Sequence, residues 1–168
     1  PRLVTVCADV RDPGNAGTIL RAADSAGADA VILTASSVDI HNPKAVRSTV
    51  GSLFHLPVVS GVDFAELSSR LHDAGITILA ADGYGSQDLD ALQDSSALRR
   101  LAPAADAADA GPRLEDPSAW LFGNEAQGLA EDELAAADYR VAVPVYGQAE
   151  SLNVGTAATV CLYASARA

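Results

Sequence analysis

The sequence predicts a single α/β domain in which a mostly parallel sheet is flanked by helices. Three observations support this prediction. The chain has 168 residues, a length that suits one compact domain. Its hydrophobic content of 49% is enough to form a core. Short apolar runs alternate along the chain with segments of helical periodicity, which is typical of α/β proteins.

The expected strands are short apolar runs, and the expected helices show apolar residues at helical spacing. No apolar run reaches the ~20 residues that a membrane-spanning helix needs, so we expect no membrane association. The second helix stops at Gly75, a favourable residue after a helix C-terminus. In chain order, the strands are expected at residues 3–8, 30–33, 56–59, 76–80, 120–122 and 139–143, and the helices at 15–26, 64–74 and 154–166.

The net charge of −11 comes from 22 acidic and 11 basic residues, and it argues against a domain that holds nucleic acid by its overall charge. The charge is unevenly distributed, however. Residues 1–60 are neutral, whereas residues 82–119 carry eight acids and three bases. The segment of about 86–117 is rich in Ala, Asp, Ser and Pro, and is nearly low-complexity over 102–111. We expect it to be an acidic surface insertion.

The cysteine and histidine residues do not suggest a metal site. Cys7 and Cys161 lie in apolar surroundings without a Cys-x-x-Cys pair, and the three histidines lack metal-ligand spacing. We expect two buried thiols in a reducing, cytoplasmic environment.

The first polar motif follows the first expected strand. A Pro13-Gly14 turn precedes a helix that begins near Asn15, a favoured N-cap residue. Gly17 allows a backbone or a ligand to approach the first turn, and Arg21 shares its helix face. This motif lacks the third glycine of a dinucleotide-binding fingerprint. Taken alone, it is better explained as a capped helix with a packing glycine and a surface arginine than as a functional site.

Two further motifs follow later strands. Strand 120–122 runs into Gly123-Asn124-Glu125, where the carboxylate could accept substrate hydrogen bonds or cap a helix. After strand 139–143, a polar loop leads through Ser151 and Asn153 into the last helix, and both residues are ordinary N-caps.

Together, the three motifs resemble those of the SpoU (TrmH-like) family of SPOUT-class RNA methyltransferases. The resemblance covers residues 3–164 and implies an α/β fold whose C-terminal segment forms a trefoil knot. The matching residues are Asn15-x-Gly17-x-x-x-Arg21, then Leu121-Phe122-Gly123-Asn124-Glu125, then Val143-Pro144 and Glu150-Ser151-Leu152-Asn153-Val154.

The resemblance implies that S-adenosyl-L-methionine is the cofactor and that its methyl group is transferred to a ribose 2′-hydroxyl of RNA. Apolar strand ends and free backbone groups are suited to holding an adenine ring. The implied cofactor-binding residues are Leu121, Phe122, Gly123, Asn124, Val143, Pro144, Val145, Ser151, Leu152, Asn153 and Val154.

The same similarity implies catalytic roles for Arg21, Asn15, Glu125, Ser151 and Asn153. An arginine is a weak base because its pKa exceeds ~12, so we favour Arg21 as a group that positions the hydroxyl and stabilises alkoxide charge. A segment at 42–57 resembles an RNA-contacting segment of the family, although a solvated helix face remains an alternative. The implied RNA-binding residues are Arg11, Arg21, Lys44, Arg47 and Ser48.

The implied partners are an RNA substrate, with rRNA favoured over tRNA, and a second copy of the chain contacted through the knot region and last helix. The domain lacks a basic surface, so we expect an N-terminal RNA-binding domain outside residues 1–168. Three alternatives remain open at this point. They are a tRNA ribose methyltransferase, a catalytically silent cofactor-binding dimer and a flavodoxin-type nucleotide-binding domain.

Overall fold

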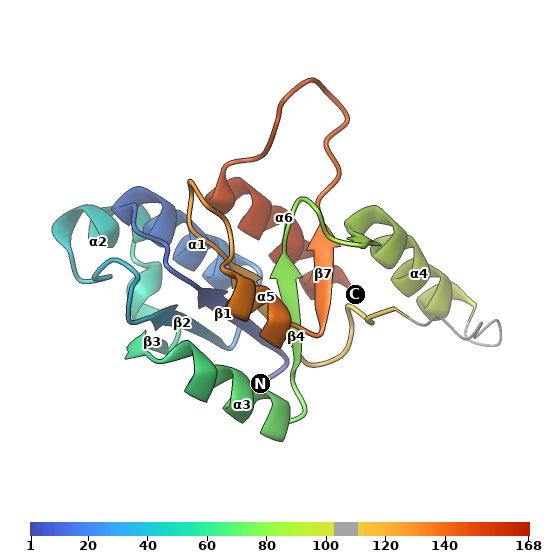
Figure 1. Ribbon diagram of the computed structural model, residues 1–168, viewed down its shortest axis with the longest axis horizontal. Coiled ribbons are helices and arrows are strands. Elements are labelled where there is room, and N and C mark those ends of the chain that lie inside the picture. Colours follow the sequence, from blue (N-terminus) through green and yellow to red (C-terminus); the bar gives the residue numbers. More distant parts are fainter. Residues whose placement is uncertain (103–110) are drawn as a thin grey trace.

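The structure is a computed structural model that describes residues 1–102 and 111–168, and one parallel sheet forms its centre (Figure 1). The seven strands of this sheet lie in the order β3-β2-β1-β6-β4-β7-β5, and each strand is parallel to its neighbours. Their bounds are β1 Leu3–Cys7, β2 Ala30–Thr34, β3 Val58–Val62, β4 Thr77–Ala81, β5 Gln87–Asp88, β6 Ser118–Phe122 and β7 Tyr139–Ala142.

Helices connect these strands and cover both faces of the sheet, as the sequence predicts for this fold class. A short 3-10 helix, η1, follows the second α-helix. The bounds are α1 Pro13–Ser25, α2 Pro43–Thr49, η1 Ser52–Phe54, α3 Phe64–Asp73, α4 Leu89–Leu101, α5 Glu131–Ala136 and α6 Val154–Arg167.

The core is divided by the sheet into two apolar layers. Successive side chains of a strand point to opposite faces, so β1 contributes to both layers. Val4 and Val6 pack with Leu67 and Leu71 of α3. Cys7, on the opposite face, packs with the buried residues of α1, α4 and α6. Every residue of β1 is buried, and its sequence is apolar at every position except Thr5.

The last helix packs far from the strand that precedes it. β7 lies near one edge of the sheet, yet α6 contacts α1 and the central strands β1, β6 and β4. The intervening segment 143–153 forms the tall loop at the top of Figure 1. Trp120 of β6 connects the sheet to α6. Its ring is fully buried, and its Nε1 donates a hydrogen bond to Ser165 Oγ at 2.8 Å. The chain therefore returns across the sheet to end beside its first strand.

The start of α1 differs from the prediction. Asp12, not Asn15, is the N-cap, and its Oδ2 accepts a hydrogen bond from the Asn15 backbone N–H at 2.8 Å. Pro13 then occupies the first helical turn, where a missing N–H has no cost. The prediction of Asn15 as the cap is wrong, because an aspartate directly before a proline starts the helix earlier. The side chain of Asn15 is consequently free for another contact.

The prediction of a surface insertion over about 86–117 needs correction in its first half. β5 pairs with β7 and adds a strand to the sheet, and α4 buries Leu89 and Leu92 in the core. Arg99 near the end of α4 binds Glu115 with two N···O distances of 2.5 and 3.1 Å, which lowers the pKa of the Glu115 carboxyl to about 2. Part of the low-complexity stretch, residues 103–110, lies outside the described residues.

The two cysteines are buried free thiols, as predicted. Burial, reinforced by the charge of Glu125, raises the pKa of the Cys7 thiol to about 12. Over residues 1–102 and 111–168, none of the helices has the length and apolar character that crossing a membrane requires.

Candidate functional site

The three polar motifs meet at the carboxyl edge of the sheet. β1, β6 and β7 run parallel, so the loops that follow them emerge on the same side. These loops are residues 8–12, 123–130 and 143–153. In open α/β sheets this edge is where ligands bind. Side-chain hydrogen bonds between the loops set the geometry of this candidate site.

Glu125 joins the second loop to the first. Its Oε1 accepts a hydrogen bond from the Asp12 backbone N–H at 3.0 Å, and its Oε2 accepts one from the Arg11 N–H at 3.3 Å. Two bonds from one carboxylate fix the backbone immediately before α1. In this structure Glu125 therefore holds the loop that precedes α1.

Asn124 donates two hydrogen bonds to Asp9, a residue that the sequence motifs do not include. Asn124 Nδ2 donates to the Asp9 carbonyl oxygen at 3.1 Å and to Asp9 Oδ2 at 3.3 Å. Asp9 Oδ1 accepts from Arg11 Nε at 2.7 Å, and this bond raises the pKa of the arginine. Asp9 adopts a left-handed backbone with φ 56°, which short polar side chains tolerate better than others. The sequence signal that could have identified Asp9 is its position as a polar residue at the end of a buried strand.

Gly123 is required by its own loop. A Cβ at this position would lie 2.5 Å from the backbone carbon of Gly128. The loop folds back there, since the Asn124 N–H donates to the Gly128 carbonyl at 2.9 Å and the Gly128 N–H returns a bond at 2.8 Å. The close approach that requires a glycine at position 123 is thus between two parts of the protein.

Asn15 and Asn153 connect the first and third motifs. Asn153 caps α6 by accepting hydrogen bonds from the N–H groups of Gly155 and Thr156, at 2.9 and 3.3 Å. Its Nδ2 donates to Asn15 Oδ1 at 2.9 Å, across 138 residues of sequence. A Cβ on Gly155 would lie 2.8 Å from Thr18 Cγ2, so this glycine allows α6 to approach α1. One asparagine therefore both starts α6 and ties it to α1.

Replacing Asn153 with alanine should lower the free energy of unfolding by about 1–2 kcal/mol, because both the cap and the link to α1 are lost. Asn15→Ala removes only the link and should cost less than about 1 kcal/mol. Urea denaturation of both single variants and the double variant gives the coupling energy. Equal losses for the two single variants would show that the cap contributes nothing.

Arg21 is not joined to the other predicted catalytic residues. It lies one turn beyond Gly17 on α1 and is exposed. Within residues 1–102 and 111–168, no hydrogen bond or ion pair holds its guanidinium. Ser151 is likewise exposed and without a partner in the part of the chain that the structure describes. The structure thus brings together Asn15 with Asn153, and Glu125 with the first loop, but leaves Arg21 and Ser151 open to solvent.

The predicted RNA-contacting residues of the second basic segment lie on α2, against α1. Gly17 contacts α2 directly, because a Cβ there would collide with Ser48 Cβ and lie 2.8 Å from the Ala45 carbonyl. Ser48 Oγ donates to the Lys44 carbonyl at 2.8 Å. Lys44 and Arg47 are both exposed, so their charges can reach a ligand.

The third loop, residues 143–153, has backbone groups that are available to bind a ligand. Among the described residues, no hydrogen bond involves positions 145–152, so their peptide groups are available to a ligand. Val145 and Leu152 expose apolar side chains in this loop. Leu121 and Phe122 differ, because their side chains are buried in the two core layers. At those two positions only the backbone can face a cofactor.

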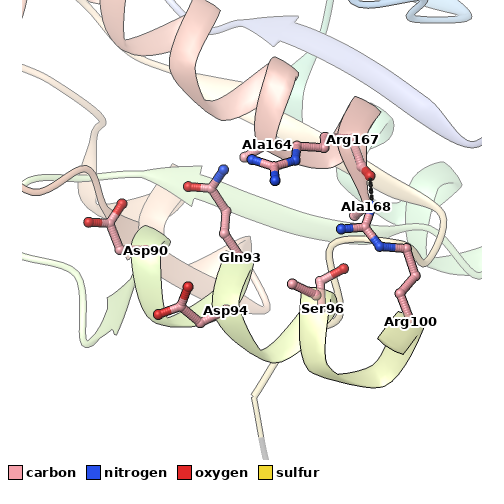
Figure 2. Close-up of a pocket in the computed structure, with 9 residues that line it drawn as sticks. Asp90, Gln93, Asp94, Ser96, Arg100, Ala164, Arg167 and Ala168 are labelled. Atoms are coloured by element: carbon pink, nitrogen blue, oxygen red, sulfur yellow. Dashed lines mark hydrogen bonds between the residues drawn. The ribbon is translucent and has the colours of Figure 1, made fainter. Parts of the chain in front are cut away.

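The structure also contains a pocket of about 230 Å³ away from the three loops, between α4 and the C-terminal end of α6 (Figure 2). Asp90 and Asp94 line one end, and Arg100 and Arg167 lie toward the other. None of the predicted site residues takes part. In the described ranges, no group of three or more His, Cys, Asp or Glu side chains is arranged to hold a metal ion.

Comparison with known proteins gives consistent matches over the whole chain. The sequence model of the SpoU rRNA Methylase family matches residues 2–163. The chain is 37% identical over 162 residues to the 23S rRNA (guanosine(2553)-2′-O)-methyltransferase RlmP of Bacillus subtilis (strain 168), covering 96% of this chain and 57% of RlmP. It is 33% identical over 161 residues to a 23S rRNA (uridine(2479)-2′-O)-methyltransferase of Streptomyces viridochromogenes, covering 92% and 49%.

The fold also matches solved structures. The crystal structure of the SpoU methyltransferase AviRb from Streptomyces viridochromogenes, in complex with the cofactor AdoMet, superimposes with a TM-score of 0.79 and 31% identity. The match covers 98% of this chain and 59% of AviRb. The chain therefore spans about half the length of the relatives that it matches.

Proposed function

Because the chain belongs to the SpoU rRNA methylase family, we propose that it transfers a methyl group from S-adenosylmethionine to a ribose 2′-hydroxyl of RNA, with ribosomal RNA as the substrate. One observation carries the proposal. The three motif loops converge at the carboxyl edge of the sheet, and Glu125 and Asn153 hydrogen-bond across them.

The cofactor is proposed to lie against the third loop. The unpaired peptide groups of 145–152 would bond its polar edge, and Val143, Pro144, Val145 and Leu152 would contact its apolar parts. The backbone of 121–124 would complete the site from β6. When bound, S-adenosylmethionine supplies a methyl group on a positively charged sulfur that departs as a neutral thioether.

The chain's own side chains would position the ribose. Arg21 presents a cation that stabilises the developing alkoxide and orients the attacking oxygen. Asn15 and Asn153 hold the start of α1 against the start of α6, and Ser151 offers a free hydroxyl to the ribose or to the cofactor's amino-acid end. Glu125 holds the backbone of the first loop in place by accepting a hydrogen bond from the Asp12 N–H. Arg11, Lys44 and Arg47 would contact RNA phosphates.

The assembled enzyme is proposed to be a homodimer in which α6 and the third loop face a second copy. Val160 and Tyr163 expose apolar surface on α6, which supports burial against another subunit. In this arrangement Arg21 of one copy can serve the cofactor of the other. We also propose the family's trefoil knot, a cytoplasmic location and an RNA-binding domain outside residues 1–168, which would compensate for the acidic charge.

Two measurements test the proposed function. Isothermal titration calorimetry should show binding of S-adenosylmethionine and no binding of FMN or NAD. Restoring the full-length gene to a deletion strain should then add one ribose methyl group to ribosomal RNA, mapped by mass spectrometry. A methyl group on tRNA would change the substrate, and cofactor binding without any methylated RNA would indicate a catalytically silent dimer.

A further inference from the structure

The segment between α2 and β3 exposes two large apolar side chains that the core does not use. Phe54 is 80% exposed and Val50 is 65% exposed. Their neighbours Leu53 and Leu56 pack against the core, and the three-residue repeat of η1 then directs Phe54 outward. Val50 ends α2 in a left-handed conformation with φ 49°, which is strained for a β-branched residue. The fold holds both side chains out in water.

The charge around these side chains is unlike that of the rest of the chain. Residues 40–62 contain no Asp or Glu, and this is the longest acid-free stretch of a sequence that carries 22 of them. The same stretch includes Lys44 and Arg47, both exposed. Its His55 is paired with Asp24 of α1 at 2.7 Å. The patch formed by Lys44, Arg47, Val50 and Phe54 is therefore locally basic and apolar.

This patch lies along α1 at the level of Arg21. Ser48 of α2 touches α1 at Gly17, and His55 after η1 reaches α1 at Asp24. Arg21 lies between these two contacts, and residues 17, 21 and 24 share one helix face. The segment that carries Val50 and Phe54 thus packs on the side of α1 that bears the arginine proposed to position the ribose.

We propose that Phe54, supported by Val50, is a stacking platform for an unpaired RNA base next to the methylated nucleotide. An exposed aromatic ring beside cations is the arrangement with which proteins hold single-stranded nucleic acid. In a two-fold contact between copies the basic patch would face its own counterpart, and the like charges would repel, whereas an RNA strand presents the opposite charge. This inference rests on the proposed function, and it adds that the substrate presents unpaired nucleotides at the site.

The test compares Phe54 variants of the full-length protein for binding to a single-stranded RNA that carries the mapped site and to the same sequence as a duplex. Phe54→Ala should weaken single-strand binding about 5- to 150-fold, the loss typical of one stacked base. Phe54→Trp should bind like the parent, because it keeps an aromatic face. Phe54→Leu should be as weak as Phe54→Ala. Leu101→Ala, an 84% exposed apolar residue on α4, is the matched control and should change nothing.

Further readouts separate this platform from an apolar protein contact. A 2-aminopurine beside the target nucleotide should lose fluorescence on binding the parent and keep it with Phe54→Ala. The sedimentation coefficient and the affinity for S-adenosylmethionine should be the same for all variants. Normal RNA binding by Phe54→Leu, or a changed oligomeric state of Phe54→Ala, would overturn the proposal. If the parent methylates RNA and all Phe54 variants bind equally, the platform is wrong while the proposed function stands.

Discussion

Arg21→Ala is expected to slow methyl transfer about 10²–10³-fold and to leave the affinity for S-adenosylmethionine unchanged. The size of the loss is that of removing one preorganised group that stabilises an oxyanion. The cofactor affinity should survive because the proposed cofactor cradle, residues 121–124 and 143–154, does not include this side chain. No ion pair of the described residues depends on Arg21 either, so the fold should be unaffected. Single-turnover transfer rates and calorimetry measure the two quantities separately.

Arg70 provides the matched control. It is an exposed helical arginine on α3 whose ion pair with Glu66 is the surface type that contributes little. Arg70→Ala should therefore transfer methyl groups at the parent rate. Arg21→Lys should recover only part of the loss, since an ammonium keeps the charge without the planar fork. Parent-like transfer by Arg21→Ala would remove this arginine from the mechanism.

The location of the site could be predicted from the sequence because it depends on local rules. An apolar strand followed by a glycine or proline turn predicts where a loop leaves a sheet, and parallel strands bring such loops to one edge. The structure places the three motifs at Asn15, Glu125 and Asn153 at that edge, joined by hydrogen bonds. That the three motifs together form one methyltransferase site is implied by their resemblance to the family. The periodicity of the sequence alone does not indicate this.

The contacts within the site could not be predicted, because they join residues that are distant in the sequence. Asn153 meets Asn15 across 138 positions, and Glu125 meets Asp12 across 113. No local pattern encodes either pairing. The two-residue strand β5 was missed for a different reason: it is stabilised by β7 and not by an apolar run of its own.

A second large effect is expected from Gly17→Ala, which should lower the free energy of unfolding by about 1–3 kcal/mol. Alanine normally stabilises a helix interior relative to glycine by ~1 kcal/mol. A decrease in the free energy of unfolding would therefore already show that the new Cβ collides with a neighbour. The new Cβ would lie 2.8 Å from the Ala45 carbonyl and collide with Ser48 Cβ. Because backbone atoms of α2 cannot move aside cheaply, α2 must shift away from α1. Urea denaturation measures the loss.

Gly14→Ala separates this collision from a general effect of the substitution. It lies in the first turn of the same helix, and its Cβ would meet only the exposed side chain of Asp12, at 3.0 Å from Oδ2. Because this oxygen caps α1, the most that its displacement can cost is the cap, about 1 kcal/mol. Gly14→Ala should therefore change stability by less than about 1 kcal/mol. Since α2 carries Lys44 and Arg47, Gly17→Ala should also weaken RNA binding while cofactor binding persists. A Gly17→Ala protein as stable as the parent would mean that α2 is not packed on α1 through this glycine.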